Sequence, residues 1–442
     1  SNLRLQMGAN SYPDILFQCP GNVANELSLT RRLLNWDQFE SEIPDYIQIF
    51  EDGVDGGWAW IKSMICASDG QIYYLPSKNP RATARCWYYR EGTLENMGLI
   101  QDQSDLPTTV DDFIELMLEV KKADPESTPL FLDTSQDFAG WSNAFNVQSS
   151  YYVDPFTDEF VPYGPVTDTW RQMLIALNKL YAVGVIDQDY LTLTTDQANA
   201  NNTAGKYYAQ FNWAGKRVNT LNSQTKQTDP DCNWVYSLDM LTNDVNRKAT
   251  FVNETPYNDC GPVLTDNLSE DQLSRLLDYF NWSATEEGSW FLSWGVEGET
   301  YSIDAEGKAQ TLPQYASFQN PSGENLTLSL VYHQDYIPNR DIGAVINTSG
   351  TTNIELSNSF NEKGYKGYRS LNFVFDIDTQ ETVNMLYTII NDMRNEYSNQ
   401  FVMGLLDPNS DSDWDKYVSD LTQSGLDEWS QYYVDYYNEH LS

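Results

Sequence analysis

Helix-like and strand-like segments alternate along the whole chain, and this alternation restricts the available folds more than any other feature. Apolar residues recur at helical spacing in several stretches, and short strand-like runs lie between them. This order favours an α/β architecture. At 442 residues the chain is too long for one ordinary core, so we expect about two or three domains. No internal repeat or low-complexity linker separates them, which indicates that the chain passes between domains several times.

Several segments carry start and stop signals of helices. Thr108 is a candidate cap for a helix with Phe113, Leu116, Met117 and Val120 on one face. Ser269 with Gln272, and Asp378 with Glu381, resemble capping boxes. A helix over 170–180 is expected to stop at Gly184. Two short amphipathic helices are predicted at 414–421 and 426–437. We predict strands at 13–19, 72–75, 207–213 and 234–241, and a hairpin over 300–312.

The charge balance excludes two classes of partner. The chain has 26 Lys and Arg against 64 Asp and Glu, a net charge of −38. Such a field repels nucleic-acid phosphates and anionic lipid surfaces. The sequence contains no run of about 18–20 apolar residues that could span a bilayer, and we expect no signal peptide in it.

The cysteines and histidines provide little material for a metal or cofactor site. The five cysteines contain no C-x-x-C pair, and the chain has only two histidines. Buried thiols are the favoured interpretation, with a Cys232–Cys260 disulfide as the alternative. Asp407, Asn409, Asp411 and Asp413 have calcium-loop spacing, but Ser412 stands at the required glycine and Val418 at the required glutamate. We interpret this run as helix capping and expect no metal and no cofactor.

The aromatic content points to ligand binding. Thirteen Trp, 29 Tyr and 18 Phe occur in a chain that lacks P-loop, Rossmann, HExxH and GxSxG motifs. Flat aromatic faces pack on the C–H faces of sugars, while carboxylates and amides bond their hydroxyls. Most of these rings are nevertheless expected to lie in cores. A binding protein without enzymatic activity is favoured, and the alternative is a glycoside hydrolase that uses a carboxylate pair in a cleft.

Nine short segments occur in an order that resembles a known family. They are YPDILF (12–17), SDGQIYYLP (68–76), WYYR (87–90), MGL (97–99), LPTTVDDF (106–113), GVID (184–187), GKYYA (205–209), WGVEGETY (294–301) and DWDKYV (413–418). Together they resemble the extracellular solute-binding proteins, family 1, of ABC importers, especially the long lipoprotein branch of Gram-positive bacteria.

The resemblance implies a two-lobed α/β fold of the periplasmic-binding-protein type II, with a hinge and a ligand cleft between the lobes. The lobes would comprise 1–88 with 258–336, and 89–257 with 337–442, with crossings near Tyr88, Asn258 and Tyr336. The YPDILF segment would be a buried central strand. The strand–helix–strand unit that precedes it in relatives is expected to be missing, and segment 122–130 lacks the calcium ligands that relatives often carry there.

The resemblance also implies a function and partners. The protein would be extracellular and lipid-anchored on a Gram-positive cell, and it would act as a monomer. It would capture an oligosaccharide or another neutral small molecule and deliver it to the permease subunits of the importer.

Candidate ligand contacts follow from the same resemblance. Trp213, after the GKYYA strand, is expected to stack on a sugar ring. Trp141 and Asp137 lie in a polar turn, where the alternative for Asp137 is a helix cap. The remaining candidates are Gln18 and Asn22 after the first strand, Trp58, and two residues beside the crossings, Trp87 and Tyr257. For each aromatic residue the alternative is core packing.

Overall fold

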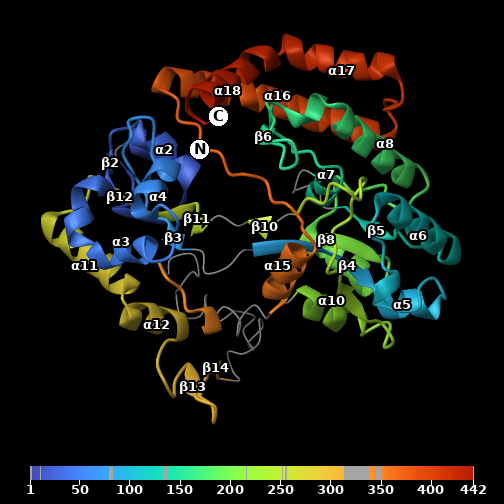
Figure 1. Ribbon diagram of the computed structural model, residues 1–442, viewed down its shortest axis with the longest axis horizontal. Helices are drawn as coiled ribbons and strands as arrows, with labels where there is room; N and C mark the ends of the chain where they lie inside the picture. The colour runs from blue at the N-terminus through green and yellow to red at the C-terminus, as the bar shows by residue number, and fades with distance from the viewer. Residues whose placement is uncertain are drawn as a thin grey trace. The chain divides into compact units, whose positions relative to one another are not determined.

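The computed structural model describes residues 2–9, 11–78, 83–132, 138–215, 217–250, 252–253, 256–312, 338–344 and 351–441. The chain forms two compact units (Figure 1). The first comprises Ser1–Ala82, Glu254–Gly350 and Val374–Gln380, and the second comprises Thr83–Asn253, Thr351–Phe373 and Glu381–Ser442. Each unit is therefore assembled from separate stretches of the chain. The lobe limits expected from the sequence stay predictions, and Tyr336 lies outside the described residues.

The first unit contains an antiparallel sheet in the order β1-β12-β2, formed by Ile15–Pro20, Cys260–Thr265 and Leu33–Leu34. Two smaller ribbons pair β3 (Ser77–Lys78) with β11 (Tyr257–Asn258), and β13 (Tyr301–Ile303) with β14 (Ala309–Thr311). The helices are α1 (Asn2–Gly8), α2 (Gly21–Ser28), α3 (Pro44–Glu51), α4 (Gly57–Ile65), α11 (Glu270–Ala284) and α12 (Glu286–Trp294), with a 3-10 segment at Trp36–Glu42.

The prediction of a buried central strand at 13–19 is wrong. Within the described part of the chain, β1 is an edge strand that pairs with β12 alone. Its middle residues are exposed, and Phe17 keeps 41% of its surface accessible. An apolar run does not distinguish an edge strand from a central one, because the strands that flank it come from distant parts of the chain.

The second unit is built on a five-stranded sheet. Its strands run in the order β10-β4-β8-β5, and β9 also pairs with β4. The strands are β4 (Thr83–Arg90), β5 (Leu130–Phe131), β8 (Ala209–Trp213), β9 (Trp234–Tyr236) and β10 (Val252–Asn253), beside a ribbon of β6 (Tyr152–Val153) and β7 (Phe160–Val161).

Ten helices of this unit lie in the part of the chain that the structure describes. They are α5 (Glu91–Asn96), α6 (Val110–Ala123), α7 (Ala139–Ala144), α8 (Asp168–Ala182), α9 (Thr195–Thr203), α10 (Arg217–Thr225), α15 (Thr352–Glu362), α16 (Ile377–Met403, whose first turn is counted with the first unit), α17 (Asp411–Gln423) and α18 (Leu426–His440). Arg171 of α8 lies over the Trp414 ring of α17, so the C-terminal helices pack against α8. Short 3-10 turns occur at Gln103–Asp105 and Gly164–Val166.

Most predicted helix signals are confirmed, and two are corrected. Ser269 and Gln272 form the expected capping box, and Gly184 ends α8 with φ +74°. The cap of α6, however, is Thr109 rather than Thr108. Asp376 rather than the predicted box receives the backbone N–H of Thr379 at the start of α16. The observed caps lie one and two residues away from the predicted ones, because neighbouring Thr and Asp residues offer equivalent oxygens.

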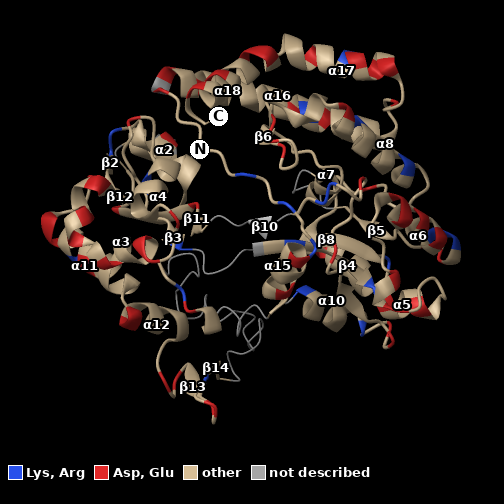
Figure 2. Ribbon diagram, viewed as in Figure 1, with Lys and Arg blue, Asp and Glu red and all other residues tan. Residues whose placement is uncertain are grey.

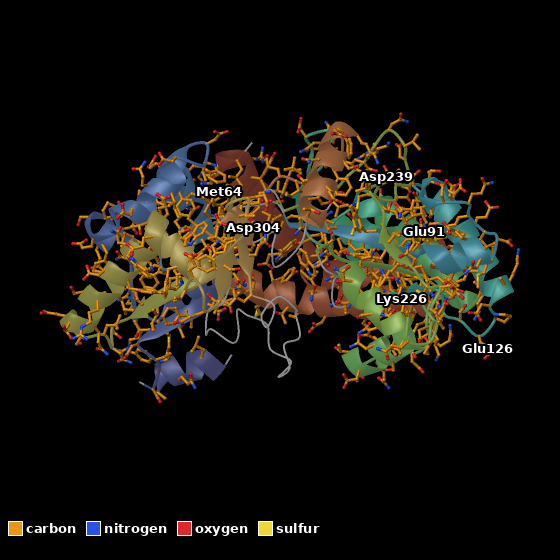
Figure 3. All side chains as sticks on the ribbon, turned by 90° about the horizontal axis from the view of Figure 1, so that it is seen from below. Met64, Glu91, Glu126, Lys226, Asp239 and Asp304 are labelled. Carbon is orange, nitrogen blue, oxygen red and sulfur yellow. The ribbon has the colours of Figure 1, made fainter. Side chains whose placement is uncertain are left out.

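The hairpin and the C-terminal acidic run behave as the sequence predicts. Asp304, which is labelled in Figure 3, lies in the turn between β13 and β14. Its carboxylate accepts the backbone N–H groups of Glu306 and Lys308. Ser410 caps α17, and Asp407 accepts the backbone N–H of Asn409. The carboxylates of this run are thus engaged with backbone donors at the start of a helix.

Tyrosine hydroxyls bond many of the carboxylates. Acidic side chains outnumber basic ones over both units (Figure 2), so most carboxylates have no Lys or Arg available. Phenol donors fill part of this role. The pairs are Tyr12 with Asp266 at 2.5 Å, Tyr73 with Asp69 at 2.6 Å, Tyr208 with Asp124 at 2.9 Å, and Tyr74, Tyr236 and Tyr397 with Asp259, Glu355 and Asp420.

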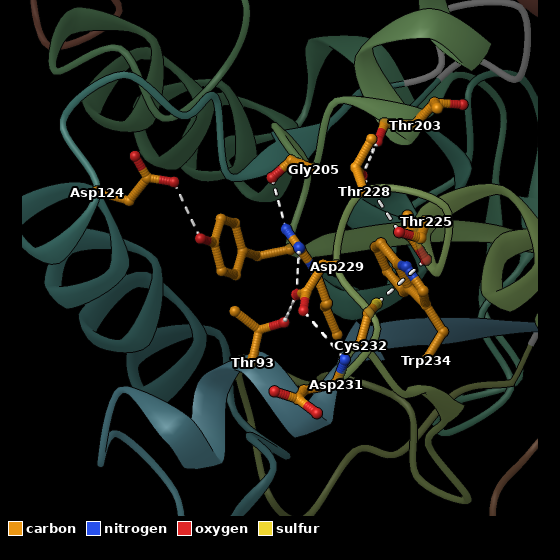
Figure 4. Close-up of polar contacts among 12 residues, drawn as sticks. Thr93, Asp124, Thr203, Gly205, Thr225, Thr228, Asp229, Asp231, Cys232 and Trp234 are labelled. Atoms are coloured by element: carbon orange, nitrogen blue, oxygen red, sulfur yellow. Dashed lines mark hydrogen bonds and ion pairs between the residues drawn. The ribbon is translucent and has the colours of Figure 1, made fainter.

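A buried arginine connects three segments of the second unit. Arg90, at the end of β4, donates to the Gly205 carbonyl at 2.6 Å and to Asp229 at 2.7 Å. Thr93 also donates to Asp229 (Figure 4). Burial alone would raise the pKa of Asp229, but the bonds from Arg90 and Thr93 outweigh it and hold the pKa below its ordinary value. Arg90 therefore joins β4, the turn before β8 and the segment before β9.

Asp229→Asn should destabilise the second unit by about 2 kcal/mol at pH 7, because it leaves the Arg90 guanidinium buried without its counter-ion. Thermal unfolding measures the loss. Since the folded pKa of Asp229 is lowered, its contribution is present above pH 3.8 and is lost as the pH falls through the folded pKa. Asp271→Asn is the control, because Asp271 and Arg275 form an exposed pair whose loss should cost under about 0.5 kcal/mol. Equal losses in both variants would contradict this assignment.

Tyr236→Phe should lower stability by about 1 kcal/mol at neutral pH, because it removes the phenol bond to Glu355. Burial, and then the bond to Glu355, raise the pKa of Tyr236 to about 12. The contribution of the neutral phenol is therefore complete below pH 10 and is lost as the pH rises through 12. Denaturant unfolding between pH 7 and 11 should show the two proteins converging. The same comparison in a Glu355→Gln background should converge less, and an unchanged difference at pH 11 would refute the assignment.

Candidate functional site

The pairing of β4 with β8 arranges one row of side chains on one face of the second unit's sheet. The antiparallel register places Arg85 opposite Trp213, Trp87 opposite Phe211, and Tyr89 opposite Ala209. Alternate residues of a strand share a face, so these three pairs lie in one row. The row begins in the core and ends at Trp213.

The inner part of the row is an aromatic core. The Trp87 ring centre lies 5.0 Å from that of Phe113, 6.0 Å from that of Trp141 and 5.4 Å from that of Phe211. Gly140 allows α7 to approach the sheet, because a Cβ there would lie 2.6 Å from the Phe211 ring. The Trp87 ring of β4 thus packs against Phe211 of β8, Phe113 of α6 and Trp141 of α7.

Two predicted ligand contacts lie inside this core. Trp87 and Trp141 are 1% and 2% exposed, so the core-packing alternative describes both rings in this structure. A cavity of about 20 Å³ lies beside them, lined by Trp87, Phe131, Leu132, Phe138, Ala139, Gly140, Trp141 and Phe211. This volume suits a single water molecule. Neither indole N–H has a partner among the described residues. Asp137, the other predicted contact of this loop, lies outside the described residues.

Trp213 lies at the exposed end of the row. Its side chain is 45% exposed, and the Arg85 guanidinium lies 3.9 Å from the centre of its ring. The Tyr88 hydroxyl donates to the Trp213 carbonyl at 3.0 Å, and the Ala214 N–H donates to the Ala84 carbonyl at 2.9 Å. The backbone is therefore fixed on both sides of an indole that has surface available for a ligand, an arrangement suited to stacking on a sugar ring.

Other polar groups contact β8 and the start of β4. Arg217 donates to the Gln210 amide oxygen at 3.0 Å, and the Gln210 amide nitrogen has no partner among the described residues. Asn353 of α15 accepts the Ala84 N–H at 3.1 Å. Sequence reasoning missed these residues and Arg85. The strand register brings Arg85 to Trp213, and no local motif reveals that register.

Two candidates of the first unit are accessible. Gln18 and Asn22 are exposed at the end of β1 and the start of α2. Gly21 between them donates its N–H to the Asp259 carbonyl at 3.1 Å, and its missing side chain leaves room for Asp259 and Tyr74. This close approach fixes the strand-to-helix turn that presents both amides. Their role in ligand binding stays a prediction.

The other two candidates of the first unit are packed. Trp58 is 4% exposed; its ring lies 5.5 Å from Phe50, and its N–H donates to Glu40 at 2.9 Å. Tyr257 is 5% exposed and meets the half-buried Trp60 edge-on at 6.2 Å. Core packing, the alternative stated for each aromatic, describes both in this structure.

Metal-ligand clusters, disulfides and membrane-crossing helices are each absent among the described residues. Within them no three His, Cys, Asp or Glu side chains are placed to hold a metal ion together. All five cysteines are free thiols, so the Cys232–Cys260 disulfide is absent. Cys19, Cys86 and Cys232 are buried as expected, whereas Cys66 and Cys260 are half-buried. None of the described helices combines the length and apolar character needed to cross a membrane.

Comparison with known proteins identifies the fold. No known family profile matches the chain. Lipoprotein LipO of Bacillus subtilis is 22% identical over 257 residues, which are 53% of this chain and 47% of LipO, so the match spans about half of that relative.

Solved structures match over almost the whole chain. The alginate-binding protein AlgQ2 has a TM-score of 0.75 at 17% identity, covering 98% of this chain and 88% of AlgQ2. The S. pneumoniae ABC-transporter substrate-binding protein FusA, solved with kestose, has 0.71 at 15% identity, covering 99% and 90%. A solute-binding protein from Bifidobacterium longum infantis that binds HMO has 0.70 at 15% identity, covering 99% and 89%. The predicted resemblance is confirmed at the level of architecture: this chain has the two-lobed α/β fold of the solute-binding proteins of ABC transporters.

Proposed function

We propose that the protein is the extracellular solute-binding component of an ABC importer and that it captures an oligosaccharide. The observation that carries this proposal is the half-exposed Trp213 on a fixed strand end, in a chain with the solute-binding fold. A flat indole offers a sugar ring apolar contact, and the amides and carboxylates of an acidic surface bond its hydroxyls. The proteins with similar structures include binders of kestose, HMO and N-glycans, which supports a carbohydrate as the ligand.

Capture without turnover is the proposed activity. The similar structures are binding proteins rather than enzymes, although a carboxylate pair would suffice for a glycoside hydrolase. The protein would hold the glycan and release it to the permease subunits of the importer, acting as a monomer. Closure around the glycan requires only that the ligand bind the closed conformation more tightly than the open one.

The proposed location of the protein is the outer surface of a Gram-positive cell, where a lipid anchor would hold it. Its support is the partial match to a Bacillus lipoprotein together with the extracellular solute-binding fold. The net charge of −38 suits a neutral ligand, because the charge attracts neither phosphate nor anionic lipid.

Trp213→Ala should weaken glycan binding by about 1–3 kcal/mol, the value of one lost stacking and burial contact. Calorimetry with a panel of fructo-, manno-, xylo- and milk-type oligosaccharides measures the affinity. Thermal unfolding should change little, because the side chain is half exposed. Trp213→Phe should keep part of the affinity, since it retains an aromatic face.

Trp290→Ala is the matched control for this experiment. Trp290 of α12 is 38% exposed, but its ring packs against Trp294 and Tyr301 and its N–H donates to the Tyr301 hydroxyl, so its loss should leave the affinity unchanged. Product analysis of the same mixtures should find the glycans intact. Shortened glycans would contradict the proposal and favour the hydrolase, while normal affinity in Trp213→Ala would exclude Trp213 from the site.

A further inference from the structure

The environment of Trp213 is asymmetric. The guanidinium of Arg85 lies over the indole at 3.9 Å from the ring centre, within the range of a cation–π contact. Arg85 itself is 6% exposed, so its guanidinium lies between the ring and the body of the unit. The indole is 45% exposed, which fits a ring with one face covered and the other open to solvent.

The backbone bonds around this pair fix where each side chain starts. Arg85 and Trp213 are directly opposed in the β4–β8 ladder, where side chains stand on the same face at close range. The Tyr88 hydroxyl holds the Trp213 carbonyl, and the Ala84 carbonyl holds the next N–H along. The contact with Arg85 restricts the rotation of the Trp213 side chain.

We propose that Arg85 is a positioning residue of the ligand site, which holds the Trp213 indole from beneath so that one defined face receives a sugar ring. This inference rests on the proposed function. A half-exposed side chain has several rotamers available, and a contact that selects one of them lowers the cost of ordering the side chain on binding. With the guanidinium beneath it, the ring is ordered before the ligand arrives. The same contact excludes a sandwich in which the glycan covers both faces of the ring.

The variants of the test separate positioning from general stability. Arg85→Met keeps the length of the side chain and removes the cation, whereas Arg85→Lys keeps a cation of different shape. Arg85→Met should weaken glycan affinity roughly 2- to 10-fold, the cost of ordering one freed side chain on binding. Arg85→Lys should fall between Arg85→Met and the native protein.

A double-mutant cycle shows whether Arg85 affects the glycan affinity through Trp213. In a Trp213→Ala background, Arg85→Met should cause no further loss of affinity, because the residue that it positions is gone. An equal loss in both backgrounds, or no loss in either, would overturn the proposal. A purely structural role of Arg85 would lower affinity in both backgrounds alike.

A second measurement needs no ligand. The fluorescence of Trp213 is the part that disappears in Trp213→Phe. Its quenching by acrylamide should increase when Arg85 is changed to Met, since the indole is then no longer held by the guanidinium and its ring becomes more accessible on average. Unchanged quenching would overturn the proposed positioning. Failure of the native protein to bind any glycan of the panel would refute the proposed function, and the quenching experiment would still decide the role of Arg85.

Discussion

The antiparallel register of β4 and β8 is the constraint on which the rest of the second unit depends. It sets Trp87 against Phe211, which creates the aromatic core under α6 and α7, and it sets Arg85 against Trp213, where the core meets solvent. A slip of one residue would exchange the two faces of β8 and turn Trp213 away from Arg85. The Arg90 bonds to Gly205 and Asp229 oppose such a slip, because they tie the end of β4 to the turn that leads into β8.

A shortage of basic residues shapes the rest of the polar interior. With 64 acids and 26 basic side chains, ion pairs can engage only a minority of the carboxylates. A tyrosine beside a carboxylate has two roles: its ring packs in an apolar cluster, and its hydroxyl donates a hydrogen bond to the carboxylate. Tyr236, for example, extends β9 toward α15 and bonds Glu355 there. Many of the 29 tyrosines are therefore structural, which leaves a smaller set of rings for a ligand.

The sequence predicted the architecture well, whereas the ligand contacts that it indicated stay predictions. Helices such as α11 and α8 follow from capping residues and apolar spacing that lie within one segment. Trp213 was predicted from its place after the GKYYA strand, and the structure finds its ring exposed. Trp87 and Trp141 are also tryptophans in segments that predicted ligand contact, yet residues from distant parts of the chain cover them. Burial depends on these distant partners, and for that reason Arg85 and the edge position of β1 were also beyond sequence reasoning.

Gly140 shows how such distant partners restrict later change in the chain. Because Gly140 has no Cβ, α7 lies directly against the Phe211 ring. That ring occupies the space that a Cβ at position 140 would need. The largest residue tolerated at 140 is thus set by the residue at 211, far along the chain. We expect the two positions to be coupled in evolution, so that a homologue with a small residue at 211 could carry a larger one at 140. A larger residue at 140 alone would lift α7 from the sheet that carries Trp213.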